Sequence, residues 1–181
     1  GELGWELHHP IEMQNYIFDK VMEAGAEFDI KPFGIRAMDS MRLEKSYRLI
    51  PREMSIEYSA FESGLDRFVR LDKEEDFIGK TALSQWQDTG PTNGFVTMEV
   101  LGIVDADARG SEAICKDGEV VGRATSGGYG WRCGKSLALG LVRLELAAIG
   151  TELEIEILGK KYKAIVIEES PFDPTNECLR S

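Results

Sequence analysis

The sequence predicts an α+β protein, with a largely helical first half and an all-β second half. Two observations predict this class: apolar residues recur with helical spacing in the first half and with a period of two in the second. A third is the position of Asp-Gly and Gly-Lys pairs between the later apolar runs, which is typical of hairpin turns. The second half is therefore expected to form a compact antiparallel barrel or sandwich.

Beyond the fold class, five helix or strand patterns are visible in the first half. Residues 1–7 are expected to form the end of a strand, and the apolar spacing that follows predicts a helix over residues 10–25. A second helix is predicted over residues 32–45, because it opens on a proline and ends on a lysine, as helix polarity favours. Alternate apolar residues predict a strand over 65–71, and a short helix is expected over 81–87.

A run of turn-forming residues over 88–94 separates the two halves. We therefore predict a domain boundary there, with one unit over residues 1–90 and a second over residues 91–181. Short strands bounded by glycine-rich turns are predicted in the second unit. They cover residues 95–100, 113–115, 120–121, 136–144, 152–158 and 161–168.

The composition is that of an ordinary globular protein, with 43% hydrophobic and 29% charged residues in a chain of 181. The formal net charge of −11 argues against nucleic acid as a partner, because a phosphate backbone requires Lys and Arg. No apolar run approaches about 20 residues, so we expect no membrane partner. Because the sequence opens on Gly1 without a Met or a signal peptide, we expect a fragment of a longer parent.

The cysteines and histidines do not predict a disulfide framework or a metal site. Cys115, Cys133 and Cys178 are odd in number and widely spaced, which favours a reducing compartment. The two histidines, His8 and His9, are adjacent, whereas zinc ligands recur at helical or knuckle spacing. We therefore expect no bound metal.

The opening segment brings two carboxylates and an aromatic ring together. Glu2 and Glu6 have the same parity in an extended chain, so they face one side. A half-buried Glu6 can accept N–H donors from a flat heterocycle. The alternative is a pair of solvated surface acids, and the spacing alone favours that alternative.

A charged run over residues 42–45 has two interpretations. One is a solvated helix face, in which Asp39 pairs with Arg42 and Glu44 pairs with Arg48. The other is an anion-binding segment. The spacing does not decide between them.

A glycine-rich run over residues 125–131 is also open to two interpretations. It is either a ligand-facing loop, in which Tyr129 and Trp131 offer stacking surface, or a wide barrel turn. The run lacks the G-x-G-x-x-G order of a dinucleotide site, and the chain has no Walker loop.

Several motifs, taken in order, resemble the C-terminal half of the glycine-cleavage T-protein superfamily over nearly the whole chain. The motifs are GELGWE at residues 1–6, MDSMRLEK at 38–45, DFIGK at 76–80, TSGGY at 125–129, GKSLA at 134–138 and LGKKY at 158–162. Within the superfamily, the chain is most similar to the folate-binding tails of the dimethylglycine dehydrogenase and sarcosine dehydrogenase family. SPFDP at 170–174 is similar to the sarcosine dehydrogenase side.

This resemblance implies the second half of a T-protein-like folate-binding fold followed by a small antiparallel β-barrel. It implies tetrahydrofolate as the cofactor of this segment, which receives a one-carbon unit and gives 5,10-methylenetetrahydrofolate. The unit comes from an N-methyl amine that an N-terminal flavin domain of the same parent oxidises, so FAD is expected only in that domain. The family's catalytic Asp lies upstream, so the resemblance implies no catalytic residue here and an inactive fragment.

Four binding residues follow from the resemblance. Glu6 matches the glutamate that holds the pterin ring by hydrogen bonds, and Leu7 and His8 are expected to line the same pocket. Arg67 falls where relatives often place an aromatic residue beside the folate, and its guanidinium can stack on a ring instead. A T-protein proper has an arginine where this chain has Met38, and the methionine is similar to the dehydrogenase branch.

Two other functions remain open at this point. One is a T-protein-like aminomethyltransferase or folate-dependent demethylase, and the other is a folate-binding module without catalysis. The resemblance implies a cytoplasmic location for a bacterial parent or the mitochondrial matrix for a eukaryotic one. It does not specify the amine, which the flavin domain recognises.

Overall fold

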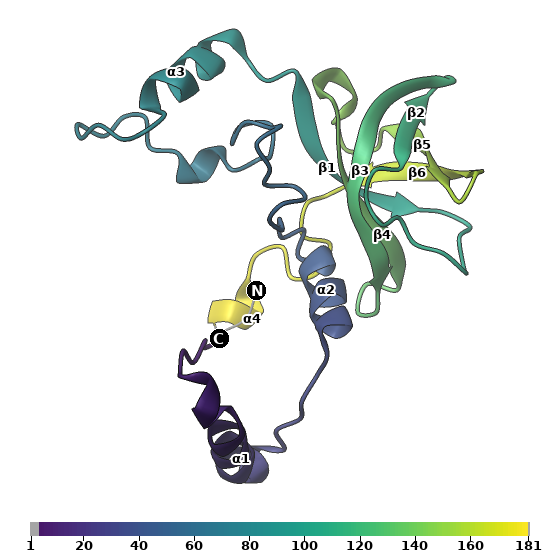
Figure 1. Cartoon of the computed structure of the whole chain (residues 1–181). Coiled ribbons are helices and arrows are strands. Elements are labelled where there is room, and N and C mark those ends of the chain that lie inside the picture. Colours follow the sequence, from purple (N-terminus) through teal and green to yellow (C-terminus); the bar gives the residue numbers. More distant parts are fainter. Residues whose placement is uncertain (1–3, 181) are drawn as a thin grey trace.

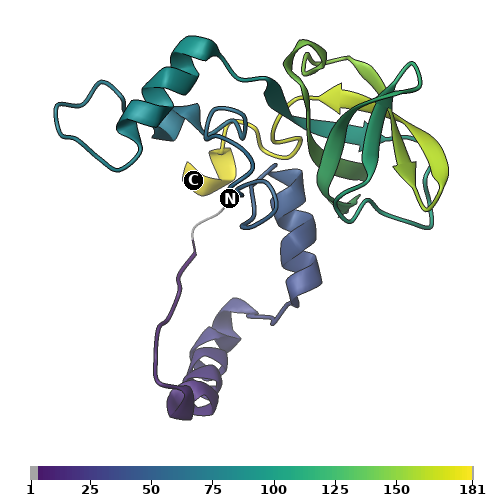
Figure 2. The same cartoon turned by 45° about the horizontal axis from the view of Figure 1, so that its top comes forward.

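The computed structural model describes residues 4–180, which form a closed β-barrel with helices extending away from it (Figure 1). Helix α2 lies against the barrel, whereas α1 and α3 project in different directions, as a second view confirms (Figure 2). The predicted α+β class and the antiparallel barrel are therefore confirmed. No helix within residues 4–180 has the length and apolar character needed to cross a membrane.

The helices of the first half agree with the sequence patterns. Helix α1 (Gln14–Gly25) follows a 3-10 turn and α2 (Ile35–Glu44) comes next, both within the predicted ranges. Helix α3 (Lys80–Thr89) ends at Gly90, which has a φ of 81° and donates its N–H to the Trp86 carbonyl at 2.9 Å. Glycine adopts this φ without a Cβ penalty, so it terminates the helix. A short α4 (Glu177–Arg180) closes the described chain.

Two predicted strands of the first half are wrong. Residues 65–71 contain a 3-10 turn, Asp66–Phe68, and otherwise irregular chain rather than a strand. Residues 4–7 form no regular element, and residues 1–3 lie outside the described range. Alternating apolar residues need a neighbouring strand for their backbone hydrogen bonds, and every described strand pair lies within the barrel after residue 92.

The barrel consists of six antiparallel strands in the order β1-β4-β3-β2-β5-β6, which closes on β1. Both predicted tight hairpins are present. The turn between β2 and β3 uses Asp117 and Gly118, with φ of 51° and 83°, as a type I′ turn requires. The strands are β1 (Asn93–Val100), β2 (Ala113–Lys116), β3 (Glu119–Gly130), β4 (Lys135–Arg143), β5 (Glu152–Ile157) and β6 (Lys160–Ile167).

The glycine-rich run at 125–130 is part of β3, so neither the ligand-facing loop nor the barrel turn is correct for it. Its glycines allow close approach by other segments. A Cβ on Gly127 would lie 2.7 Å from the Ala108 Cβ, and one on Gly130 would lie 3.0 Å from the Glu44 Cγ of α2. Glycine therefore serves packing here, against the core cluster at Gly127 and against α2 at Gly130.

The principal core of the described chain fills the barrel. Leu43 at the end of α2 packs onto Leu137 and Leu139 of β4 in a second, smaller cluster, which attaches the helix to the barrel. The side chains of the main cluster that are fully shielded from solvent are Met98, Ile114, Ala124, Ala138, Val142, Ile155 and Ala164.

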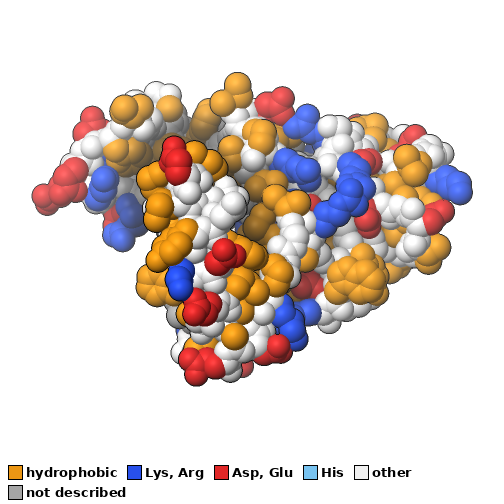
Figure 3. Space-filling view, turned by 60° about the horizontal axis from the view of Figure 1, so that its bottom comes forward, with side chains coloured by type: hydrophobic (Ala, Val, Ile, Leu, Met, Phe, Trp, Pro, Cys, Tyr) orange, Lys and Arg blue, Asp and Glu red, His pale blue; other side chains and the backbone are white. Residues whose placement is uncertain are grey.

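Helix α1, in contrast, has no buried side chain. Hydrophobic side chains gather on the surface of this arm (Figure 3). The exposed apolar residues of α1 and its flanking turns include Ile11, Met13, Tyr16, Phe18, Val21 and Phe28. The helical half therefore does not build a hydrophobic core of its own within residues 4–180.

Glu62 connects the chain before α3 to the start of the barrel. Its carboxylate accepts hydrogen bonds from the backbone N–H of Ser59 at 3.0 Å, the Thr92 hydroxyl at 3.1 Å and the Asn93 amide at 3.0 Å. Burial by itself raises the pKa of Glu62, but these hydrogen bonds outweigh it and hold the pKa below its usual range.

We expect Glu62→Gln to lower stability at neutral pH but not in strong acid. Because the folded-state pKa of Glu62 is below the unfolded value of about 4.3, its contribution is present above that pH and is lost as pH falls through the folded pKa. Urea midpoints of the two proteins should therefore differ at pH 7 and converge as the carboxylate protonates. Glu156→Gln, at an exposed position of β5, is the control; a pH-independent difference for Glu62→Gln would contradict the assignment.

Candidate functional site

A cavity of about 580 Å³ lies where α2 meets the N-terminal segment, the β3–β4 turn and the C-terminal segment. We call it the α2 cavity. Its volume is within the roughly 300–1,000 Å³ range of small-molecule sites. It is lined by Gly4, Trp5, Phe33, Met38, Met41, Arg42, Glu44, Lys45, Tyr47, Arg132 and Phe172.

Four aromatic rings form much of the wall of the α2 cavity. Trp5 and Phe33 lie on the N-terminal side and are largely exposed. On the opposite side the Arg132 guanidinium lies 4.8 Å from the centroid of the Phe172 ring. Exposed aromatic faces around a concave site favour a flat ligand that can stack between them.

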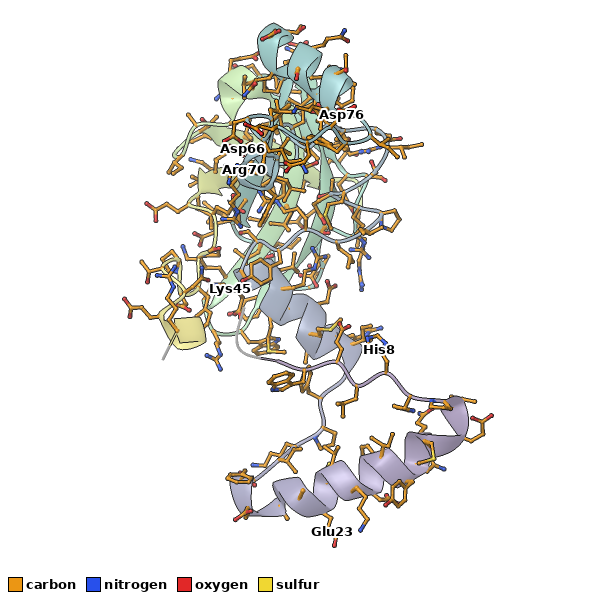
Figure 4. All side chains as sticks on the ribbon, turned by 90° about the vertical axis from the view of Figure 1, so that its left-hand side faces the viewer. His8, Glu23, Lys45, Asp66, Arg70 and Asp76 are labelled. Carbon is orange, nitrogen blue, oxygen red and sulfur yellow. The ribbon has the colours of Figure 1, made fainter. Side chains whose placement is uncertain are left out.

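Two charged side chains at the end of α2 line the cavity and are almost completely buried. Glu44 accepts hydrogen bonds from the backbone N–H groups of Arg132 at 2.5 Å and Cys133 at 3.2 Å. Lys45 donates to the Asp173 carbonyl at 2.6 Å and to the Asn176 side-chain oxygen at 2.8 Å. These bonds tie the β3–β4 turn and the C-terminal segment to α2, and thereby fix one wall of the cavity. Figure 4 shows Lys45 at this end of the helix.

Desolvation affects one thiol beside this wall. Burial raises the pKa of Cys133, and the negative charge of Glu44 raises it further. The thiol is therefore held protonated, which disfavours a nucleophilic role.

Arg42 lines the α2 cavity with its side chain 11% exposed. Its guanidinium donates to Asp39 at 2.6 Å, to the Ser126 hydroxyl at 2.8 Å and to the Tyr47 carbonyl at 3.2 Å. The predicted Asp39–Arg42 pair is confirmed. The cation is held in one orientation by partners from α2, from the chain after it and from β3.

Glu53 lies behind Arg42 and is fully buried, with 0% exposure. Its carboxylate accepts hydrogen bonds from the hydroxyls of Thr125 and Ser126, each at 2.5 Å, and from the Leu49 N–H at 2.9 Å. The Arg42 guanidinium lies 3.5 Å away. A buried carboxylate needs such compensation, so this cluster specifies how α2 and β3 are joined.

The predicted Glu44–Arg48 pair is wrong, and so is the solvated helix face at this end of α2. Arg48 instead forms an ion pair with Glu169, and its guanidinium carbon lies 3.8 Å from the centroid of the Phe95 ring. Glu44 and Lys45 are turned toward the backbone of distant segments. A helix sequence shows which residues share a face, but it does not show that the barrel covers that face.

The four predicted binding residues do not line the α2 cavity. Glu6 and His8 lie 3.6 Å apart with both side chains 90% exposed, and Leu7 between them is also exposed. Their neighbour Trp5 does line the cavity. Arg67 lies with its guanidinium 4.8 Å from the Phe68 ring. In Figure 4, Asp66 and Arg70 mark this turn and His8 marks the N-terminal segment, and the two regions lie apart.

Part of the cavity could have been found from sequence. Met38 and Met41 are three residues apart, so helical spacing puts them on one face of α2, and both line the α2 cavity. Trp5 belongs to the opening motif that was singled out. Phe172 belongs to the SPFDP motif of the resemblance. Arg132 carried no such signal, because it comes from a segment more than 80 residues beyond α2 and no local spacing relates the two. Within residues 4–180, no three His, Cys, Asp or Glu side chains are grouped to hold a metal ion.

Comparison with known protein families accounts for both halves. Residues 1–73 match the GCVT N-terminal domain, and residues 94–173 match the glycine cleavage T-protein C-terminal barrel domain. The chain belongs to the glycine-cleavage T-protein family. The family match agrees with the closed six-stranded barrel and the helices attached to it.

Individual relatives divide into two groups. The chain is 43% identical to mitochondrial dimethylglycine dehydrogenase of Homo sapiens, over 99% of this chain and 21% of that protein. It is 35% identical to aminomethyltransferase of Symbiobacterium thermophilum, over 95% of this chain and 45% of that protein. The chain therefore spans about a fifth of the first relative and less than half of the second.

A solved structure has the same fold. Glycine cleavage system aminomethyltransferase T from Bartonella henselae superimposes with a TM-score of 0.78 over 91% of this chain and 45% of that chain. The two are 23% identical in sequence. The T-protein-like fold class is thus confirmed by sequence and by structure.

We expect Glu53→Ala to lower the free energy of unfolding by about 3–5 kcal/mol, because it breaks a buried ion pair and leaves two buried hydroxyls and one N–H without their acceptor. Urea denaturation followed by circular dichroism measures the loss. Glu57→Ala is the matched control, since it removes an exposed ion pair with Arg123 and should cost less than about 1 kcal/mol. Equal losses for the two variants would show that the buried cluster does not join α2 to the barrel.

Proposed function

We propose that the chain is the tetrahydrofolate-binding portion of a larger flavin-dependent dehydrogenase that demethylates an N-methyl amine of the dimethylglycine or sarcosine type. In this proposal the one-carbon unit passes to tetrahydrofolate and gives 5,10-methylenetetrahydrofolate. The observation that carries it is the α2 cavity, with its aromatic walls and tethered charges. Identity of 43% to dimethylglycine dehydrogenase over nearly the whole chain supports the dehydrogenase branch.

The chemistry of a reduced folate suits this cavity. Its pterin and aminobenzoyl rings are flat and can stack on Trp5, Phe33 or Phe172. Its glutamate carries carboxylates, and Arg132 lines the same space with a guanidinium group, which can bind a carboxylate in a bidentate manner.

Glu6 has the chemistry to bind the pterin end of the same ligand. It follows directly after Trp5, which lines the α2 cavity, and within residues 4–180 its carboxylate lies 3.6 Å from the His8 imidazole. We propose that Glu6 accepts the pterin N–H groups when ligand and parent chain close over this segment. Leu7, His8 and Arg67 are proposed to contribute to the same closed site.

The exposed apolar surface of α1 fits a chain that works as part of a larger protein. No side chain of α1 is buried, and such a surface is expected to be covered by a neighbouring segment. We propose that residues 1–90 complete folate-binding lobes whose earlier part lies upstream, and that residues 91–181 are the small barrel. The catalytic Asp and the FAD domain would both be upstream, and this segment alone would be inactive.

A parent of this kind is proposed to lie in the mitochondrial matrix of a eukaryote or in the cytoplasm of a bacterium. The matched human relative is named as a mitochondrial protein. The amine substrate would be recognised in the flavin domain, not here.

A second candidate is a glycine-cleavage aminomethyltransferase, which the 35% identity to that group favours. Met38 argues for the dehydrogenase, because it lines the α2 cavity at the position where the resemblance implies an arginine in T-proteins. Turnover of dimethylglycine or sarcosine with flavin reduction in the parent would identify the dehydrogenase. A parent that binds tetrahydrofolate and turns over no amine would instead be a binding module.

We expect the chain alone to bind tetrahydrofolate about tenfold or more weakly than the full-length parent, because the outer wall of the α2 cavity is exposed and incomplete. Isothermal titration calorimetry under reducing conditions compares the two. Trp5→Ala should weaken binding further in both proteins, since it removes a stacking surface. Tight and equal binding by chain and parent would contradict the proposal that upstream segments complete the site.

We expect Glu6→Ala in the parent to lower the rate of methylenetetrahydrofolate formation about tenfold or more, because hydrogen bonds to a charged group are worth roughly 1.5–3 kcal/mol. Flavin reduction by the amine should be unchanged, since that step occurs in another domain. Stopped-flow flavin absorbance and a folate product assay separate the two steps. Glu12→Ala, an exposed acid in the same region, is the control; equal loss of both activities in Glu6→Ala would count against a folate-binding role.

A further inference from the structure

A second cavity, separate from the proposed folate site, collects three arginines from three parts of the chain. Arg52 comes from the turns after α2, Arg109 from the loop between β1 and β2, and Arg123 from β3. We call this space, of about 240 Å³, the arginine cavity. The chain as a whole is acidic, with a formal net charge of −11, so a cluster of three arginines around one small space is not explained by its composition.

One of the three arginines is neutralised within the protein. The Arg123 guanidinium donates to the Glu57 carboxylate at 2.5 Å and to the Tyr58 hydroxyl at 2.7 Å. The hydrogen bond with Glu57 raises the pKa of Arg123, so the guanidinium stays charged. The Glu57 side chain is 58% exposed, and it compensates a single positive charge.

The other two arginines have no ion pair among residues 4–180. Arg52 has one side-chain hydrogen bond, a long contact of 3.5 Å to the Ser126 hydroxyl. The guanidinium of Arg109 makes no hydrogen bond within the same residues. The nearby Glu112 is occupied elsewhere, because its carboxylate accepts from the backbone N–H groups of Arg109 at 2.8 Å and Gly110 at 2.7 Å.

The walls that carry these arginines are held in place. Ser126 and Thr125 both donate to the buried Glu53, which fixes β3 behind Arg52. The loop at Gly110 lies against β3, where a Cβ would come within 2.6 Å of the Thr125 carbonyl oxygen. The cavity is thus a built feature of the barrel surface, with its charges carried by anchored backbone.

We propose that the arginine cavity binds a small oxyanion, a phosphate or a carboxylate group. Guanidinium groups present paired N–H donors that match the oxygens of such an anion, and bound anions offset the repulsion between neighbouring cations. The volume is below the roughly 300–1,000 Å³ of sites for larger ligands, which restricts the ligand to a small anion or a single anionic group. The site does not depend on the proposed folate function, since it shares no lining residue with the α2 cavity.

Two-dimensional ¹H–¹⁵N NMR of the chain, titrated at constant ionic strength, tests the proposal. Sodium phosphate and disodium glutarate are the two probes, and sodium chloride is the control. We expect saturable shifts of the Gly110, Ser111 and Ala124 amides with at least one probe and none with chloride. Phosphate alone would identify a phosphate site and glutarate alone a carboxylate site, and either result supports an oxyanion site.

Variants decide whether the arginines are responsible. Arg109→Ala and Arg52→Gln should each weaken binding about tenfold or more, because each removes hydrogen bonds between a charged donor and the anion. Arg70→Ala removes an exposed arginine outside the cavity and should leave the affinity unchanged. Unchanged amide dispersion in the ¹H–¹⁵N spectrum confirms that each variant is folded. Two variants are used so that the test still stands if one of them does not fold. Non-saturable shifts spread over the surface, or full affinity in both cavity variants, would overturn the proposal.

Discussion

The buried carboxylate of Glu53 is the interaction on which the arrangement of this chain depends. It is fully shielded from solvent and accepts hydrogen bonds from two hydroxyls of β3, while Arg42 of α2 lies 3.5 Å away. An ion in such a place is tolerated only when every neighbour is positioned for it. Its partners therefore fix α2 against the outside of the barrel, and α2 supplies the inner wall of the proposed folate site.

Local patterns predicted those elements whose geometry is determined locally. The Asp117-Gly118 turn and the spacing along residues 10–25 and 32–45 have only one good local solution, and the structure contains the hairpin and both helices. The strand predicted from alternating apolar residues over 65–71 is absent, because a strand also requires a partner strand, which no local pattern supplies. The prediction of a loop or turn at residues 125–130 was wrong for a related reason. The glycines there allow Ala108 and Glu44 to approach, and both come from segments distant in sequence.

The candidate site shows the same division. Helical spacing placed Met38 and Met41 on one face, and that face lines the α2 cavity. Arg132 and Phe172 join them only because Glu44 and Lys45 bind the backbone and side chains of the β3–β4 turn and the C-terminal segment. From sequence, Glu44 and Lys45 are equally compatible with a solvated helix face, because a run of charged residues does not indicate that a barrel will cover it.

The two walls of the α2 cavity differ in how they are supported, and this difference bears on how a ligand would be held. The inner wall consists of α2 and segments tied to it by buried charges. The outer wall consists of Trp5 and Phe33, which flank a helix without a single buried side chain. A ligand gains affinity from walls that are already positioned, because ordering them at the moment of binding costs free energy. In this chain the inner wall is already positioned, whereas the outer wall becomes so only when the apolar face of α1 is covered. Covering α1 should therefore raise the affinity for the ligand, and ligand binding should in turn favour the packing of α1.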